Sequence, residues 1–114
     1  FSIPQCGSSV EIPSGTTSIN ENAYSECAEL VDLTLPDGLL TISKKAFYNC
    51  VSLKGALKIP DSVTTIGDYA FAGCGNITSL ILSKQLQTLG IYSFSEYKLY
   101  GLFCIILILR MYKP

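Results

Sequence analysis

The sequence SLKGALKIPDSVTTIGDYAFAGC, residues 52–74, defines a unit that the chain repeats. It ends with a small residue and an aromatic residue placed ahead of Cys74. This order occurs in two earlier segments and, with tyrosine in place of cysteine, in one later segment: NAYSEC (22–27), KAFYNC (45–50) and YSFSEY (92–97). The endings are separated by 23, 24 and 23 residues. A fixed period of about 20 to 50 residues indicates a repeat architecture.

Other positions recur with the same period. Prolines 13, 36 and 60 recur in step, and Ser83 takes the fourth place. Apolar residues follow them at fixed distances, in the sets Ile19, Ile42, Ile66, Leu89 and Tyr24, Phe47, Phe71, Phe94. The 24-residue interval comes from one extra residue in LKGALKIP (53–60), compared with LVDLTLP (30–36). A stacked repeat tolerates such an insertion in a loop or at a strand margin.

Composition limits the classes of function. The chain has 114 residues and a net charge of −1, which favours neither nucleic acid nor an anionic membrane as a partner. Histidine is absent, so the usual general base and the commonest metal ligand are missing. We therefore predict no catalytic, cofactor-binding or metal-binding residues. The opening FSIPQCGSSV shows no signal peptide, and a chain that begins at Phe1 is expected to be a fragment or a processed form.

Each unit is expected to contain two short strands and a turn. LTLP (33–36) and LKIP (57–60) alternate apolar and polar residues, which favours a strand, and proline ends it. A second short strand is expected at VTTI (63–66). The small residues of GDYAFAGC (67–74) favour a short helical or 3₁₀ turn whose aromatic residue and cysteine point inward. Since one unit cannot bury its own apolar side, we predict a β-rich repeat solenoid, a right-handed coil of parallel strands.

The recurring positions L-x-x-L-x-[LI]-P-x-x-[VL]-x-x-I-G-x-x-A-F-x-x-C resemble the BspA-type leucine-rich repeat, and residues 52–74 carry nearly all of them. The resemblance covers residues 10–97 as four repeats. Residues 1–9 form an N-terminal flank or partial cap, and residues 98–114 form an apolar tail. The resemblance implies a leucine-rich-repeat superhelix. The sequence departs from the pattern at Thr16, Tyr24, Ser83, Ser93 and Tyr97.

This family is known from the surfaces of host-associated bacteria and mucosal protist parasites, where its members are implicated in adhesion. The resemblance thus implies a non-enzymatic protein–protein interaction module of a cell-surface or extracellular adhesion or host-interaction protein. Its ligand would be a host or extracellular-matrix protein, or a glycan, bound through the exposed strand face. The alternative is a structural spacer or scaffold repeat with no ligand of its own. Neither nucleic acid nor a cofactor is expected.

The outward positions of the strands form the candidate ligand face. In the first strand of each unit they have mixed chemistry and, after Glu11, are Thr34, Lys58 and Ile81. In the second strand they form a ladder of hydroxyls, Ser18, Thr41, Thr65 and Thr88. The high β-propensity of threonine explains such a ladder without a ligand, and a polar strip that binds protein or glycan is the functional interpretation. Asn76 begins an Asn-Ile-Thr sequon, so it is a candidate glycosylation site and is expected to be exposed.

The cysteines Cys27, Cys50 and Cys74 lie one turn apart, about 4.8 Å in stacked strands. A disulfide within this column is within geometric reach. Packing as small buried hydrophobes is favoured, because Tyr97 takes the same position without a partner. Cys6 and Cys104 lie outside the column and could be exposed thiols.

The tail is apolar from Leu99 to Leu109 apart from Gly101, which is shorter than the stretch of about 20 residues that a membrane-spanning helix needs. A degenerate capping rung over the open end of the stack is the favoured interpretation. A surface for a partner or for self-association, or the stump of a membrane anchor, is the second. A tail that has drifted or been cut short, with no selected role, is the third.

Overall fold

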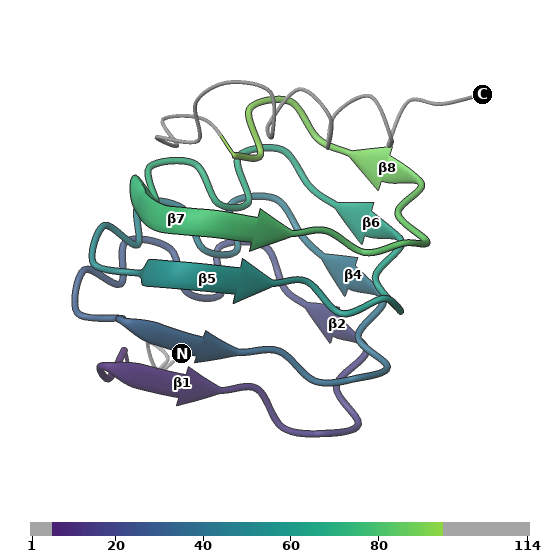
Figure 1. The fold of residues 1–114 in the computed structure, drawn as a ribbon, viewed down its shortest axis with the longest axis horizontal. Helices are drawn as coiled ribbons and strands as arrows, with labels where there is room; N and C mark the ends of the chain where they lie inside the picture. Colours follow the sequence, from purple (N-terminus) through teal and green to yellow (C-terminus); the bar gives the residue numbers. More distant parts are fainter. Residues whose placement is uncertain (1–5, 95–114) are drawn as a thin grey trace.

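The computed structural model describes residues 6–94, which form a coil of parallel strands with two strands in each turn (Figure 1). The first strands of successive turns lie above one another; they are β1 (Ser9–Glu11), β3 (Asp32–Thr34), β5 (Lys54–Lys58) and β7 (Asn76–Ile81). The shorter second strands form another column; they are β2 (Ser18–Ile19), β4 (Thr41–Ile42), β6 (Thr65–Ile66) and β8 (Thr88–Leu89). The predicted β-rich solenoid is therefore confirmed.

The short strands form one continuous parallel sheet in the order β2-β4-β6-β8. Ile19, Ile42, Ile66 and Leu89 lie opposite one another in register. Because successive side chains of a strand point to opposite faces, these apolar residues face the interior and the hydroxyl residue before each of them faces outward. This sheet holds the four turns at a regular spacing.

The longer strands form two separate sheets. β1 pairs with β3 and β5 pairs with β7, but β3 and β5 are not paired. Within residues 6–94, the main-chain hydrogen bond between these two segments runs from Lys54 N to Val31 O, 3.3 Å apart, next to the start of the strands. The column is therefore interrupted between the second and the third turn.

The pairing of β5 with β7 is irregular near the residue inserted in the third turn. The register of β5 and β7 shifts between Gly55 and Ala56: Gly55 pairs with Ile77, whereas Ala56 pairs with Ser79. Gly55 has a φ of 82°, a left-handed conformation that glycine adopts at no steric cost. The shift leaves Thr78 of β7 without an opposite residue, so the β-bulge lies in β7, where it disrupts the local ladder. Three residues separate Leu53 from Leu57, whereas two separate Leu30 from Leu33, so the extra residue of the third turn falls within β5.

The interior of the coil contains a column of stacked aromatic rings. The ring centroids of Tyr24 and Phe47 are 5.3 Å apart, those of Phe47 and Phe71 are 5.1 Å apart, and those of Phe71 and Phe94 are 5.2 Å apart. The planes of neighbouring rings differ by at most 10°. Phe47 and Phe71 are completely buried, as the inward assignment of this column predicted.

The segments before the cysteines are turns, and the described residues contain no helix, so the expected helical or 3₁₀ turn is not formed. Ala46 N donates to Ser43 O within a turn whose third residue, Lys45, has a φ of 57°. Such a left-handed residue interrupts a helix and is typical of a type II turn. It also leaves the next amide free for the neighbouring turn, and Phe47 N donates to Ala70 O at 2.8 Å. The backbone therefore bonds between turns instead of within a helix.

Several expectations concern residues that lie outside the described part of the chain. They are the capping rung, partner surface or anchor assigned to residues 98–114, the place of Tyr97 in the cysteine column, and the free thiol of Cys104.

Candidate functional site

The outward residues of the longer strands lie on the solvent side of the coil. Glu11 lies opposite Thr34 and Lys58 lies opposite Ile81, and all four are exposed. Ile81 has 52% of its surface exposed, which is high for a large aliphatic side chain in a strand. Thr34 and Lys58 lie on opposite sides of the break between β3 and β5. The row that the sequence predicts as continuous is therefore interrupted at its centre.

The predicted hydroxyl ladder is regular. Ser18 lies opposite Thr41, Thr41 opposite Thr65, and Thr65 opposite Thr88. Ser18 and Thr88 are exposed, whereas Thr41 and Thr65 are half-buried. This row belongs to the sheet of short strands, so the residues proposed as one ligand face are divided between separate sheets.

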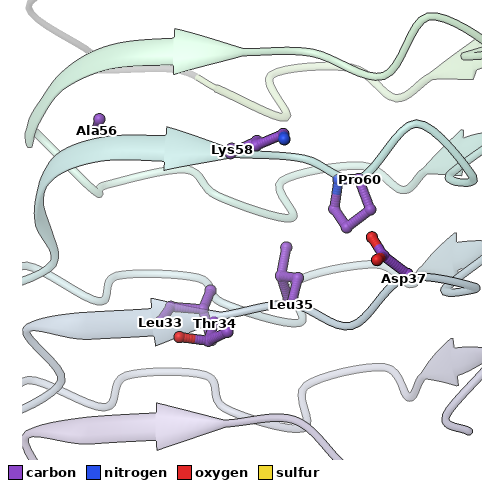
Figure 2. Close-up of a pocket in the computed structure, with 7 residues that line it drawn as sticks. All are labelled: Leu33, Thr34, Leu35, Asp37, Ala56, Lys58 and Pro60. Atoms are coloured by element: carbon purple, nitrogen blue, oxygen red, sulfur yellow. The ribbon is translucent and has the colours of Figure 1, made fainter. Parts of the chain in front are cut away.

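A cleft of about 280 Å³ lies between the second and third turns, where β3 and β5 are not paired (Figure 2). Leu35 and Asp37 point into it from one side and the ring of Pro60 from the other, as Figure 2 shows. The remaining lining residues are Leu33, Thr34, Ala56 and Lys58. Its wall is thus apolar at the centre and carries one acidic and one basic side chain.

The expectation for Cys6 was wrong. Cys6 forms a disulfide with Cys27, with their Cα atoms 5.4 Å apart, so it is not a free thiol. Its partner is the first cysteine of the buried column, and the bridge joins the N-terminal flank to the first turn instead of linking two members of the column. The sequence prediction considered disulfides only within the column. Cys6 lies 21 residues before Cys27, close to one repeat period, and this spacing could have indicated the pair.

The other two cysteines of the described column pack as buried thiols. Cys50 and Cys74 are fully buried, and Cys74 Sγ donates to Phe47 O at 3.2 Å, as Cys50 Sγ does to Tyr24 O. The neighbouring Cys50 sulfur, together with burial, raises the pKa of the Cys74 thiol. A thiol with a raised pKa is a poor nucleophile. The same contact with Cys74 lowers the pKa of the Cys50 thiol. Both side chains are completely buried, so the favoured packing role fits both residues.

Asn76 is exposed at the start of β7, as expected for a glycosylation site. Its side-chain Nδ2 donates to Val51 O at 2.7 Å.

Asp61, at the turn after Pro60, accepts a hydrogen bond from Lys84 N at 3.1 Å. This aspartate therefore stabilises the turn above it.

The sequence prediction missed a row of tyrosines, Tyr48, Tyr69 and Tyr92, on the outer side of the turns. The ring centroids of Tyr69 and Tyr92 are 5.5 Å apart, and Tyr48 meets Tyr69 edge to face at 6.4 Å. Lys45 Nζ lies 5.3 Å from the centroid of Tyr48 and 5.9 Å from that of Tyr69. Tyr69 and Tyr92 have φ values of 58° and 56°, which are unusual for bulky residues. The recurrence of Lys45, Tyr69 and Tyr92 at one repeat position was the signal in the sequence.

Residues 6–94 hold no group of three or more metal-ligating side chains of the His, Cys, Asp and Glu types. Over the same residues, no helix is long and apolar enough to cross a membrane.

The family model described as "BspA type Leucine rich repeat region (6 copies)" matches residues 4–106. A leucine-rich repeat protein from Bacteroides ovatus ATCC 8483 is 28% identical, with a TM-score of 0.52 over 78% of this chain and 29% of that chain. A leucine-rich repeat protein from T. pallidum is 19% identical, with a TM-score of 0.42 over 96% of this chain and 86% of its own. No curated protein matches the sequence.

Proposed function

The chain belongs to the BspA-type leucine-rich repeat family, and on this premise we propose that it is a non-enzymatic protein-interaction module that binds through its exposed strand faces. Repeats of this family generally serve in protein interaction. We further propose that the parent protein acts at the cell surface in adhesion or host interaction, because BspA-type proteins are typically surface-associated. The matched solved protein from Bacteroides ovatus is much longer, since the alignment covers 29% of it.

The observation that supports this proposal most is the register of the outward side chains. Ser18, Thr41, Thr65 and Thr88 lie at the same position of four successive turns. A flat ligand surface can therefore contact several turns at once, and each turn contributes the same hydroxyl chemistry. In solenoid proteins such extended surfaces are the usual binding surfaces.

The chemistry of the described residues favours binding over catalysis. A nucleophilic cysteine needs a base or a cation to lower its pKa. The chain contains no histidine, and the thiols of Cys50 and Cys74 are completely buried. We therefore propose that the module uses shape and polar complementarity, with no cofactor. The proposed ligand is a host or extracellular-matrix protein, and a glycan is the second ligand class.

A pull-down from purified extracellular-matrix and host-cell surface proteins tests the proposal. We expect capture by the wild-type protein and loss of capture when Thr41, Thr65 and Thr88 are replaced by Lys, because three long cations would disrupt the flat strip. The control replaces Ser14, Ala28 and Gln85 by Lys, since these residues are neutral and exposed and lie outside the strands. Equal loss in both variants would indicate a charge effect and contradict the proposed face.

A structural spacer is the alternative, and one observation favours it. The outward row of the longer strands has no common chemistry, since it contains Glu11, Thr34, Lys58 and Ile81. If the folded wild-type protein captures none of the ligands, the spacer interpretation is supported.

A further inference from the structure

We propose that the cleft between β3 and β5 binds an extended peptide segment of a protein partner, which forms main-chain hydrogen bonds with the walls of the cleft. This inference rests on the proposed function, because it names the kind of partner that the interaction module takes. The cleft is a separate site from the hydroxyl ladder, because the ladder lies in the sheet of short strands.

The cleft exists because the third turn is one residue longer than its neighbours. The extra residue of LKGALKIP (53–60) falls between Leu53 and Leu57, where Gly55 has a φ of 82°. On the side of the short strands the turns stay paired, and Thr41 lies opposite Thr65. The same two turns are therefore closed at one sheet and open at the other.

The wall formed by β3 presents unpaired main-chain groups. Thr34 O accepts a hydrogen bond from Ile12 N at 3.0 Å, so the main-chain groups of Thr34 point toward the first turn. Alternate residues of a parallel strand bond to opposite neighbours. The N–H and C=O groups of Leu33 and Leu35 therefore point toward β5, yet no hydrogen bond joins β3 to β5 at these positions.

The wall formed by β5 is complementary. Ile59 N donates to Ile81 O at 2.8 Å, so the main-chain groups of Ile59 point toward β7. By the same alternation those of Ala56 and Lys58 point toward β3 and into the cleft. Pro60 lacks an N–H group, so the donors of this wall end at Lys58.

Donors and acceptors that alternate along an extended line match the main chain of another strand. Peptides that extend a sheet in this way gain affinity from main-chain hydrogen bonds and specificity from alternate side chains. Here Leu35 and Pro60 provide an apolar seat for one side chain, while Asp37 and Lys58 place opposite charges on the two walls. The favoured occupant is thus an extended segment with an apolar residue between a basic and an acidic one.

The test uses a random-peptide phage library selected on the immobilised protein. The enriched peptide is synthesised with a fluorescein label, and its Kd is measured by fluorescence anisotropy. Deleting Gly55 restores the 23-residue period and should pair β3 with β5. We expect the deletion to weaken binding about tenfold or more, as the loss of two main-chain hydrogen bonds would. Methylating the central amide nitrogen of the peptide should weaken binding similarly.

Two further variants keep the test decisive if the deletion does not fold. Ala56→Phe fills the cleft and should abolish binding, whereas Glu11→Phe adds the same ring to an exposed strand position outside it and should leave Kd unchanged. Amide exchange provides a direct readout. The amides of Leu35 and Lys58 should become protected when the peptide binds, while that of Ile59 is protected throughout.

The outcomes separate this inference from the proposed function. The proposed peptide site is wrong if no peptide is enriched. It is also wrong if the peptide binds the Gly55 deletion and Ala56→Phe as tightly as it binds the wild type. Capture of matrix proteins that still depends on Thr41, Thr65 and Thr88 would then leave the proposed function intact. Peptide binding that is lost in Ala56→Phe and kept in the threonine-to-lysine variant supports the inference.

Discussion

The ring centroids of Phe71 and Phe47 lie 5.1 Å apart, with an angle of 10° between the two ring planes. The spacing of successive turns brings equivalent residues together in this way. A single repeat could not bury its own aromatic ring, because each ring is covered by the ring of the next turn. The stability of the solenoid therefore depends on neighbouring repeats.

Replacing Phe71 by Ala should lower the free energy of unfolding by about 3–5 kcal/mol, because it leaves a cavity between two stacked rings. Phe71 is fully buried and contacts both Phe47 and Phe94. Urea denaturation measures the change. The control is Val51→Ala, whose side chain is 48% exposed and should change the free energy little. Equal effects in the two variants would show that the column is not the core.

Gly67 is predicted to be required for close contact between turns. A Cβ atom added to Gly67 would lie 2.5 Å from Lys44 N and 2.8 Å from the carbonyl carbon of Ser43, both of them main-chain atoms. Gly67→Ala should therefore destabilise the protein by about 1–3 kcal/mol, as overpacking does. Gly7→Ala is the control, because its Cβ would meet only Ser9 O at 3.8 Å. A thermal melt in which both variants match the wild type would contradict the predicted clash.

The stacking of the repeats explains how much of the fold could be predicted from the sequence. Phe47, Phe71 and the register of Thr41 with Thr65 follow directly from the period, since equivalent positions of successive turns must touch. The conformation of the turns could not be predicted in the same way. Left-handed φ values occur at Lys45 and Tyr69, whose side chains do not favour that conformation.

The candidate site was harder to predict than the fold. The insertion was visible in LKGALKIP (53–60), but the sequence does not say whether it lengthens a loop or separates two strands. The extra residue falls within β5, whose residues Ala56 and Lys58 line the cleft. The pairing of Cys6 with Cys27 depends on the path of the N-terminal flank, which carries no repeat pattern.

Tyr92 is predicted to stabilise the fold less than an asparagine would, and Asn22 takes the equivalent position in the first turn. Tyr92 has a φ of 56° and is 62% exposed, and the equivalent Asn22 has a φ of 60°. Asparagine tolerates this conformation better than a bulky residue does, which is worth about 1–2 kcal/mol. The substitution also removes the ring contact with Tyr69, worth about 0.5–1.5 kcal/mol, so we expect Tyr92→Asn to raise the free energy of unfolding by about 0.5 kcal/mol. Ile91→Asn is the control, since Ile91 is 65% exposed without a left-handed backbone. A gain of the same size at Ile91 would show that solubility, not backbone conformation, is responsible.

The disulfide between Cys6 and Cys27 should contribute about 3 kcal/mol to stability, because it closes a loop of 21 residues in the unfolded chain. We expect dithiothreitol to lower the free energy of unfolding of the wild type by this amount, measured by urea denaturation. The variant Cys6→Ser should start at the lower value and should not respond to dithiothreitol, because Cys50 and Cys74 are not disulfide-bonded. If both proteins lost equal stability in reductant, the bridge that matters would involve another cysteine. If neither responded, the flank would contribute nothing to the first turn through this bond.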